Sequence, residues 1–128
     1  MNHIHPSFIQ QAHQSSAKYA ADESEFDATG LDIEWQENCI APFVAESKVK
    51  YAMELVEIVP IRHNGTFFII GKVRDVFIDD AILGSDGYLH LEKANSVCSL
   101  GTDGYYTAAL QGRFAYAKPG KTAEKITS

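Results

Sequence analysis

Residues 49–78, which read VKYAMELVEIVPIRHNGTFFIIGKVRDVFI, decide the fold of this chain. Apolar side chains alternate with polar or small ones over residues 49–55, the period-two pattern of a half-buried strand. Asn64-Gly65 follows and is the strongest short signal for a hairpin turn. We therefore expect two long antiparallel strands that meet near this turn, the second over residues 66–78.

Three details of this hairpin point to a small barrel. The apolar phase shifts to Val56 and Ile58, which indicates either a bulge or a strand that crosses from a barrel to a dimer contact. The continuous apolar run 67–70 implies burial on both faces of the second strand. Gly71 permits a sharp bend, or the close approach of another backbone or a planar ligand.

Short helices are expected before the hairpin. Residues 6–16 begin with Pro6 and Ser7, which suit the first positions of a helix. Residues 24–29 predict a second helix, because Gly30 follows where a left-handed cap is wanted. The chain is therefore mainly β with short helices.

The rest of the chain is less regular. Residues 31–47 are aperiodic and predict a long surface connection with Trp35 or Phe43 turned inward. The composition of residues 119–128 indicates a polar, disordered tail. We expect a single domain over residues 1–118, since 128 residues with 45% hydrophobic side chains suit one core.

Charge and cysteine content narrow the classes of partner. Seventeen acidic against eleven basic side chains give a formal charge of -6, which disfavours nucleic-acid binding. Cys39 and Cys98 are far apart and form no zinc-ribbon or disulfide pattern, so we expect reduced thiols. No leader-like or membrane-spanning stretch is evident, and we expect a soluble, cytoplasmic protein without a membrane partner.

Several motifs are candidates for metal-binding or catalytic sites. His3, His5 and His13 suit a zinc or iron site in residue type, but they are also ordinary polar residues at a helix start, and no carboxylate lies close by in sequence. We therefore predict no metal site. The acidic loop 79–92 fails the ligand spacing of a calcium loop. Nucleotide-binding glycine motifs and the serine hydrolase motif are absent.

Two segments carry candidate ligand-binding residues. Tyr105 and Tyr106 follow a glycine-rich turn and present stacking area for a flat aromatic ligand, although one of them packing into the core is the simpler reading. Ser15, Ser16 and Lys18 supply two hydroxyls and a cation at the end of the first expected helix, which suits an anion. Such a segment is also often only solvated.

In order and spacing, six segments together resemble the flavin reductase family with the FMN-binding split-barrel fold. They are 24–31 (SEFDATGL), 42–47 (PFVAES), 53–58 (MELVEI), 64–66 (NGT) running into 69–73 (IIGKV), 86–89 (DGYL) and 104–106 (GYY). The resemblance covers almost the whole chain. It implies an antiparallel split β-barrel with short helices, usually a homodimer that binds FMN near the subunit interface.

The resemblance also implies a function. Family members pass a hydride from NADH or NADPH to the flavin, and some supply reduced flavin to a monooxygenase partner. The protein holds the flavin phosphate, stacks its ring and admits the nicotinamide. The positions carried over as cofactor-binding are Ser15, Ser16, Lys18, Tyr105 and Tyr106, while no catalytic residue is assigned.

The chain departs from the family at its start. Typical members have a further N-terminal portion, roughly the first third, that supplies contacts to the flavin phosphate, and Met1 falls where the family is finishing a strand. Thr66 stands nearest to a position where some members have histidine, and His63 is offset from it. We therefore expect an N-terminally truncated domain. The leading expectation is a flavin reductase, and the alternative is a catalytically inert dimeric or flavin-binding remnant of the same fold.

Overall fold

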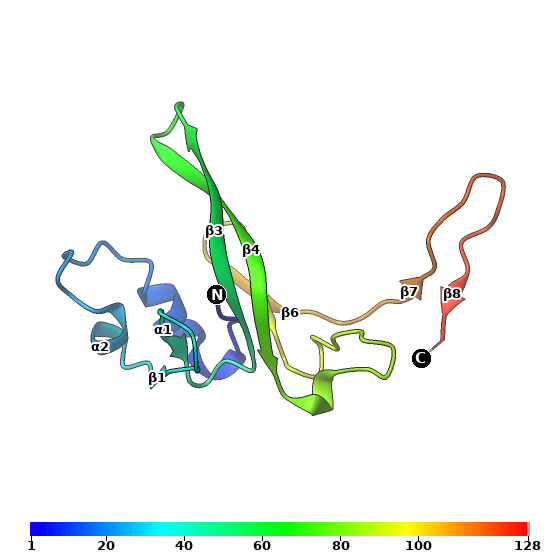
Figure 1. The fold of residues 1–128 in the computed structure, drawn as a ribbon, viewed down its shortest axis with the longest axis horizontal. Coiled ribbons are helices and arrows are strands. Elements are labelled where there is room, and N and C mark those ends of the chain that lie inside the picture. The colour runs from blue at the N-terminus through cyan, green and yellow to red at the C-terminus, as the bar shows by residue number, and fades with distance from the viewer. Residues whose placement is uncertain (128) are drawn as a thin grey trace.

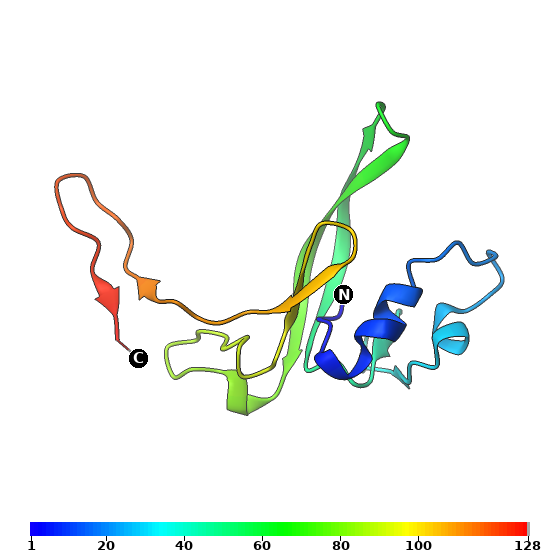
Figure 2. The same ribbon diagram turned by 180° about the vertical axis from the view of Figure 1, so that it is seen from behind.

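A computed structural model describes residues 1–127 (Figures 1 and 2). The helical elements are short: the 3-10 turn η1 (Pro6–Phe8), α1 (Ile9–Gln14), α2 (Glu25–Thr29) and the 3-10 turn η2 (Asp80–Ile82). The strands are β1 (Ile33–Glu34), β2 (Phe43–Val44), β3 (Val49–Ile61), β4 (Thr66–Ile78), β5 (Val97–Leu100), β6 (Gly104–Thr107), β7 (Arg113–Phe114) and β8 (Lys125–Ile126). The mainly β class is confirmed.

The β3–β4 hairpin dominates the structure and has the predicted limits and turn. Gly65 has a φ of 69°, a left-handed conformation that glycine adopts without strain. The Asn64 side chain closes the turn by accepting hydrogen bonds from the backbone N–H and the hydroxyl of Thr66, at 3.1 and 2.7 Å. The Asn-Gly signal therefore placed the turn correctly.

Each strand of the hairpin contains one extra residue. Arg74 has no partner where the register shifts opposite Ala52 and Met53, and Val56 has none where it shifts between Leu55 and Glu57. Of the two explanations offered for the change of apolar phase, the bulge is the one observed. It turns Ile58 back to the face that carries Leu55, because side chains alternate from one face to the other along a regular strand.

The register gives the hairpin two unlike faces. One face, here called the long face, is apolar from end to end and comprises Val49, Tyr51, Met53, Leu55, Ile58 and Pro60 of β3 with Phe67, Ile69, Gly71, Val73, Val76 and Ile78 of β4. The opposite face is charged midway along the hairpin and apolar at the tip. Its four apolar tip residues are Val59, Ile61, Phe68 and Ile70.

The base of the hairpin is covered on both faces by its own chain. On the long face, Val49 is fully buried and packs with Ile82 and Ala94 from the segment that follows β4. On the other face, Phe77 makes an edge-to-face contact with Phe43, their ring centroids 5.5 Å apart. Phe43 is only 3% exposed whereas Trp35 is 62% exposed, so Phe43 is the inward aromatic of the connection.

The N-terminal segment joins two strand pairs into one curved layer. Asn2 bridges Lys50 on the edge of β3 away from β4, and Ile4 bridges Val97 of β5, both antiparallel. The spatial order is therefore β4, β3, residues 2–4, β5 and β6. This is an antiparallel, partly open barrel.

The helices agree with the sequence. The first expected helix is η1 continued by α1, with Phe8 buried beneath it. In α2, the Ser24 hydroxyl accepts a hydrogen bond from the N–H of Asp27, and Gly30 ends the helix with a φ of 69°. A serine cap and a left-handed glycine therefore bound this helix as predicted.

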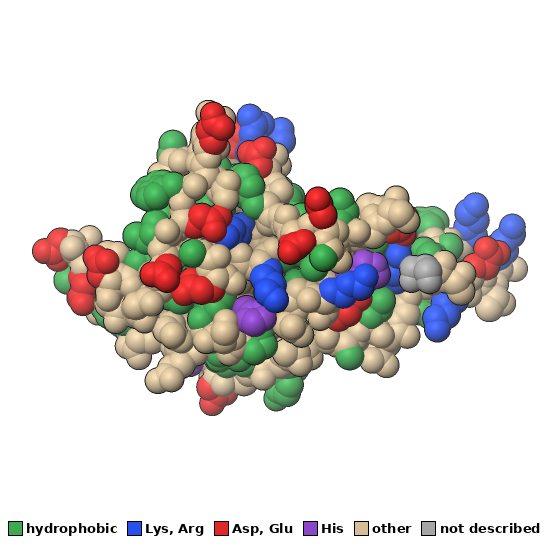
Figure 3. Space-filling model, turned by 90° about the horizontal axis from the view of Figure 1, so that it is seen from below, with side chains coloured by type: hydrophobic (Ala, Val, Ile, Leu, Met, Phe, Trp, Pro, Cys, Tyr) green, Lys and Arg blue, Asp and Glu red, His purple; other side chains and the backbone are tan. Residues whose placement is uncertain are grey.

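The segment from β7 (Arg113–Phe114) to β8 (Lys125–Ile126) projects from the rest of the structure and is called the arm below (Figures 1 and 2). Residues 119–128 were expected to be a disordered tail, yet β8 lies among them and pairs with β7. In Figure 3 the arm, at the right, carries several basic side chains. From residue 113 onward the sequence holds four basic residues, Arg113, Lys118, Lys121 and Lys125.

The tip of the hairpin lies open, contrary to the predicted burial. Phe67, Phe68 and Ile69 are 60 to 64% exposed, because no element within residues 1–127 packs over this end of β4. The chain exposes 9808 Å² in total. A compact chain of 14.1 kDa exposes about 6,700 Å² by the usual scaling, so roughly 3,000 Å² is in excess.

Candidate functional site

The end of α1 lies beside β6. The Nδ1 atom of His13 and the hydroxyl of Tyr105 are 2.8 Å apart, and the two rings meet edge to face with centroids 5.8 Å apart. Ser15 and Ser16 follow directly after this helix. The structure therefore brings the predicted serine segment and Tyr105 to one side of the molecule.

The two serine hydroxyls are held by the helix end itself. Ser15 donates to the carbonyl of Ala12 at 2.8 Å, and Ser16 donates to the carbonyl of His13 at 2.7 Å. The N–H groups of Ser15, Ser16 and Ala17 are likewise bound to carbonyls of α1. A bound anion would therefore require the hydroxyls to rotate away from these carbonyls, since an anion only accepts hydrogen bonds.

Lys18 is the cation of this segment. It is exposed and takes part in no ion pair within residues 1–127. Its neighbour Tyr19 is tied back to the helix, where its hydroxyl lies 3.1 Å from the side-chain nitrogen of Gln14. The Lys18 side chain is therefore exposed and without a carboxylate partner among the described residues, two positions after Ser16 in the sequence.

Tyr105 and Tyr106 point to opposite faces of β6. They stand opposite Ser99 and Cys98 of β5, respectively, and adjacent residues of a strand alternate in direction. Tyr105 is half-buried against His13, whereas Tyr106 is 53% exposed. Only Tyr105 shares a side with the serine segment, so the two tyrosines do not line one surface.

Ser15 also borders a hollow of about 320 Å³. The other lining residues are Glu25, Phe26, Leu31 and Val44. Three of these side chains are apolar, and the hydroxyl of Ser15 is one of two polar groups at its edge. A few polar groups on a mostly apolar wall are typical of small-molecule sites.

Each of the three histidines considered as metal ligands contacts a different hydroxyl group. The Nδ1 atoms of His3, His5 and His13 lie within hydrogen-bond distance of three different hydroxyls, those of Ser96, Ser7 and Tyr105. Within residues 1–127, no three His, Cys, Asp or Glu side chains are grouped as a metal site requires. Burial lowers the pKa of His3 below its ordinary value of 6.5.

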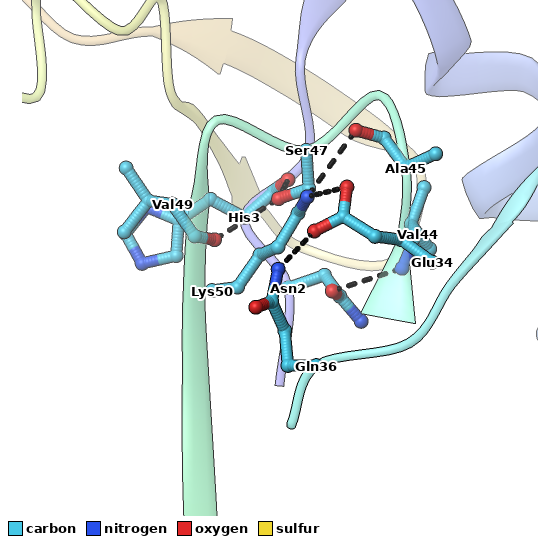
Figure 4. Close-up of polar contacts among 9 residues, drawn as sticks. All are labelled: Asn2, His3, Glu34, Gln36, Val44, Ala45, Ser47, Val49 and Lys50. Atoms are coloured by element: carbon cyan, nitrogen blue, oxygen red, sulfur yellow. Dashed lines mark hydrogen bonds and ion pairs between the residues drawn. The ribbon is translucent and has the colours of Figure 1, made fainter. Parts of the chain in front are cut away.

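Lys50 and Glu34 form a partly buried ion pair that the sequence does not predict (Figure 4). The Nζ atom of Lys50 lies 2.7 Å from a carboxylate oxygen of Glu34 and 3.3 Å from the carbonyl of Ala45. The Lys50 side chain is 8% exposed and that of Glu34 is 33% exposed. Hydrogen bonds from Lys50 and Gln36 lower the pKa of Glu34. The alternation over residues 49–55 predicts a solvent-facing Lys50. Residues 31–47, which cover this side chain, are aperiodic, so no sequence pattern predicts the contact.

A second polar group anchors the arm. Arg113 lies 2.6 Å from a carboxylate oxygen of Asp86, and its guanidinium stacks 3.9 Å from the ring centre of Tyr88. The bond from Arg113 is the main reason that the pKa of Asp86 is lowered. Arg113, the first residue of β7, is thereby bonded to the loop that follows η2. No local sequence pattern links residues 27 positions apart.

Comparison with solved structures identifies relatives. A protein from Shewanella frigidimarina NCIMB 400, assigned as a flavin reductase with a split barrel domain, superposes with a TM-score of 0.84 and is 46% identical over 91% of this chain. The alignment covers 59% of that protein, so the present chain spans less than two thirds of its relative. No family model matches the chain, and no significant match is found among curated proteins.

Two more distant structures share the fold. Flavoredoxin of Desulfovibrio vulgaris (Miyazaki F) has a TM-score of 0.66 at 22% identity, over 93% of this chain and 61% of its own. Nitrilotriacetate monooxygenase component B from Bacillus cereus has a TM-score of 0.74 at 19% identity, over 88% and 57%.

The partly open antiparallel barrel is thus a split barrel, as in the Shewanella protein, and the two more distant structures share this fold. The chain belongs to the flavin reductase split-barrel family. No helix within residues 1–127 is long and apolar enough to cross a membrane.

Proposed function

We propose that this chain contributes to the flavin site of an NAD(P)H-dependent oxidoreductase of the flavin reductase type, with FMN as its flavin. The 46% identity to the Shewanella flavin reductase across 91% of the chain carries the proposal. The grouping of the serine segment with Tyr105 supports it. When bound, the flavin supplies the hydride acceptor, and the protein supplies position and electrostatics.

The residues beside α1 fit the phosphate end of FMN. Ser15 and Ser16 offer hydroxyl donors once these rotate away from the carbonyls of Ala12 and His13, and Lys18 offers a positive charge that no carboxylate within residues 1–127 neutralises. Such charge-assisted hydrogen bonds are about twice as strong as neutral ones. Tyr105 would bound the same site from β6. Tyr106 would contact flavin only from the opposite face of that strand.

The cofactor proposal is tested by titrating the chain with FMN and with riboflavin, which lacks the phosphate, while following flavin fluorescence. Lys18→Met should weaken FMN binding by about tenfold and leave riboflavin binding unchanged, because only FMN presents an anion to the ammonium group. Lys121→Met, on the arm, is the matched control. Equal losses for both flavins would contradict the phosphate assignment, and absence of FMN binding by the parent chain would overturn the proposal.

The activity is tested by following NADH and NADPH oxidation with FMN present. We expect turnover with at least one nicotinamide nucleotide, and release of reduced flavin that a monooxygenase could use. The remaining expectations are a homodimer and a cytoplasmic location. A chain that binds FMN without oxidising either nucleotide would instead fit the second candidate below.

The second candidate is a catalytically inert flavin-binding or structural member of the same fold. It is favoured by the hydroxyls of Ser15 and Ser16, which donate to carbonyls of α1 and are thus already engaged within the chain. It predicts stable folding and self-association with no nucleotide oxidation at any flavin concentration.

A further inference from the structure

The hollow beside Ser15, called the α1–α2 hollow below, has walls from three elements of the chain. Ser15 follows α1, Glu25 and Phe26 belong to α2, Leu31 follows that helix, and Val44 belongs to β2. Its volume of about 320 Å³ is at the lower end of the range of small-molecule sites. Phe26, Leu31 and Val44 make most of the wall apolar. The hollow therefore suits a small ligand with an apolar body.

Both polar side chains of the α1–α2 hollow can only accept hydrogen bonds from a ligand. The Ser15 hydroxyl donates its one proton to the carbonyl of Ala12 at 2.8 Å, so its lone pairs alone remain free. The ionised Glu25 carboxylate has no proton to donate, and it makes no ion pair within residues 1–127. An anion would find no side-chain donor here, whereas a ligand with positively charged N–H groups would find two acceptors.

The segment that carries Glu25 adds further negative charge. Residues 22–27 hold four carboxylates and no lysine or arginine. None of the four takes part in an ion pair in the described part of the chain. Figure 3 shows acidic side chains gathered at its left end, which is the end where α2 lies in Figure 1. These carboxylates repel an anion and attract a cation, so their field favours the same class of ligand as the two acceptors do.

We infer that the α1–α2 hollow binds a small aromatic cation. The ring of this ligand packs on the apolar wall, and its ammonium group lies between Glu25 and Ser15. Phe26 favours this class of ligand, because a cation is attracted to the face of an aromatic ring. A metal ion fits less well, since it requires more oxygen ligands than these two side chains provide.

This ligand is distinct from the flavin of the proposed function, and the inference does not rest on that function. A phosphate held by Ser15 needs the hydroxyl turned away from the carbonyl of Ala12, whereas the ammonium group uses the orientation that the structure shows. The two ligands therefore engage Ser15 in opposite orientations. For this reason the test is made without flavin.

The test is an NMR titration of the isotope-labelled full chain with three benzene derivatives of similar size. At neutral pH benzylamine is a cation, benzyl alcohol is neutral and benzoate is an anion. We expect affinity to fall in that order, with benzylamine bound about fivefold more tightly than benzyl alcohol, as for a well-placed but exposed ion pair. The amide signals that shift should be those of the residues that line the hollow.

Two variants separate the hollow from the acidic segment as a whole. Glu25→Gln removes the charge at nearly constant shape, and should weaken benzylamine binding about fivefold while leaving benzyl alcohol binding unchanged. Asp27→Asn is the matched control, because it removes the same charge from the same helix at a residue that does not line the hollow. Both side chains are exposed, so neither replacement disturbs the core.

Three results would overturn the inference: no binding of benzylamine, equal binding of benzylamine and benzyl alcohol, or equal losses of benzylamine affinity in the two variants. The last result would mean that the acidic segment attracts cations without a defined site. Failure of the FMN titration would remove the proposed function and leave this inference standing, since no flavin is present here.

Discussion

His13 and Tyr105 are 92 residues apart in sequence and yet lie 2.8 Å apart across the contact between α1 and β6. This pairing links the helical N-terminal segment to the last strand pair of the barrel. It also sets the direction of Tyr105, because the ring is held edge to face against the imidazole. The candidate flavin site is consequently built from both ends of the chain.

Replacing Tyr105 by phenylalanine should lower the free energy of unfolding by about 0.5 kcal/mol, since one solvent-exposed hydrogen bond is lost. Tyr106→Phe is the matched control. The Tyr106 hydroxyl makes no hydrogen bond within residues 1–127, and the change should be nearly neutral. Urea denaturation measures both. Equal effects would contradict the assignment of Tyr105 as the linking residue.

In the partly buried ion pair of Lys50 and Glu34, the two partners should differ in their effect on stability. Glu34→Ala should destabilise the fold by about 2 kcal/mol, because it leaves the Lys50 ammonium buried with only one carbonyl acceptor. Lys50→Met should cost less, since the remaining Glu34 carboxylate is partly exposed and can be hydrated. The midpoint of urea denaturation should be lower for Glu34→Ala than for Lys50→Met. The reverse order would contradict this account of the pair.

Acidification should destabilise the chain in two stages. Burial lowers the pKa of His3, so the unfolded chain binds more protons, and stability is lost as pH falls below 6.5. Glu34 and Asp86 also have lowered pKa values, and the stability they add above their ordinary values of 4.5 and 3.8 is lost as pH falls through the lowered ones. Unfolding measured across this range should show a smaller first stage in His3→Gln than in the parent chain, because His5, whose pKa is lowered by burial and by Lys48, still contributes to it.

Arg113 should control how firmly the arm is held. Arg113→Ala removes both the contact to Asp86 and the stacking on Tyr88, so the arm should be cut more rapidly in limited proteolysis. Arg113→Lys should restore little, because a lysine cannot reproduce a planar group that stacks and pairs at once. Lys121→Ala is the control, and an unchanged cleavage rate in Arg113→Ala would show that the anchor lies elsewhere.

Much of the fold could be predicted from local patterns. The hairpin, its Asn64-Gly65 turn, both helices and the Gly30 cap depend on residues close in sequence, and each is observed. The bridging role of residues 2–4 could not be predicted, because it depends on where β3 and β5 lie in space. The strand β8 was missed for a related reason: two residues paired with β7 leave no periodic pattern.

The candidate site could be predicted only in part. Ser15, Ser16 and Tyr105 were singled out by residue type, and the structure brings them to one side. His13, which links them, was read instead as a possible metal ligand. The burial of Lys50 was missed because a single lysine between Val49 and Tyr51 is the ordinary pattern of a half-exposed strand. The positions of these side chains depend on contacts between residues far apart in sequence.

The two bulges of the hairpin compensate each other. Arg74 is an extra residue in β4 and Val56 is an extra residue in β3. The two strands therefore have equal length, and the register at the base of the hairpin is the one that the turn sets. Deleting either residue alone would close its bulge and keep every pair and both faces, because the residues on its two sides already pair with adjacent partners. Loss of a paired residue would instead shift the register and turn apolar side chains outward, so shortening of this hairpin should be tolerated best at positions 56 and 74.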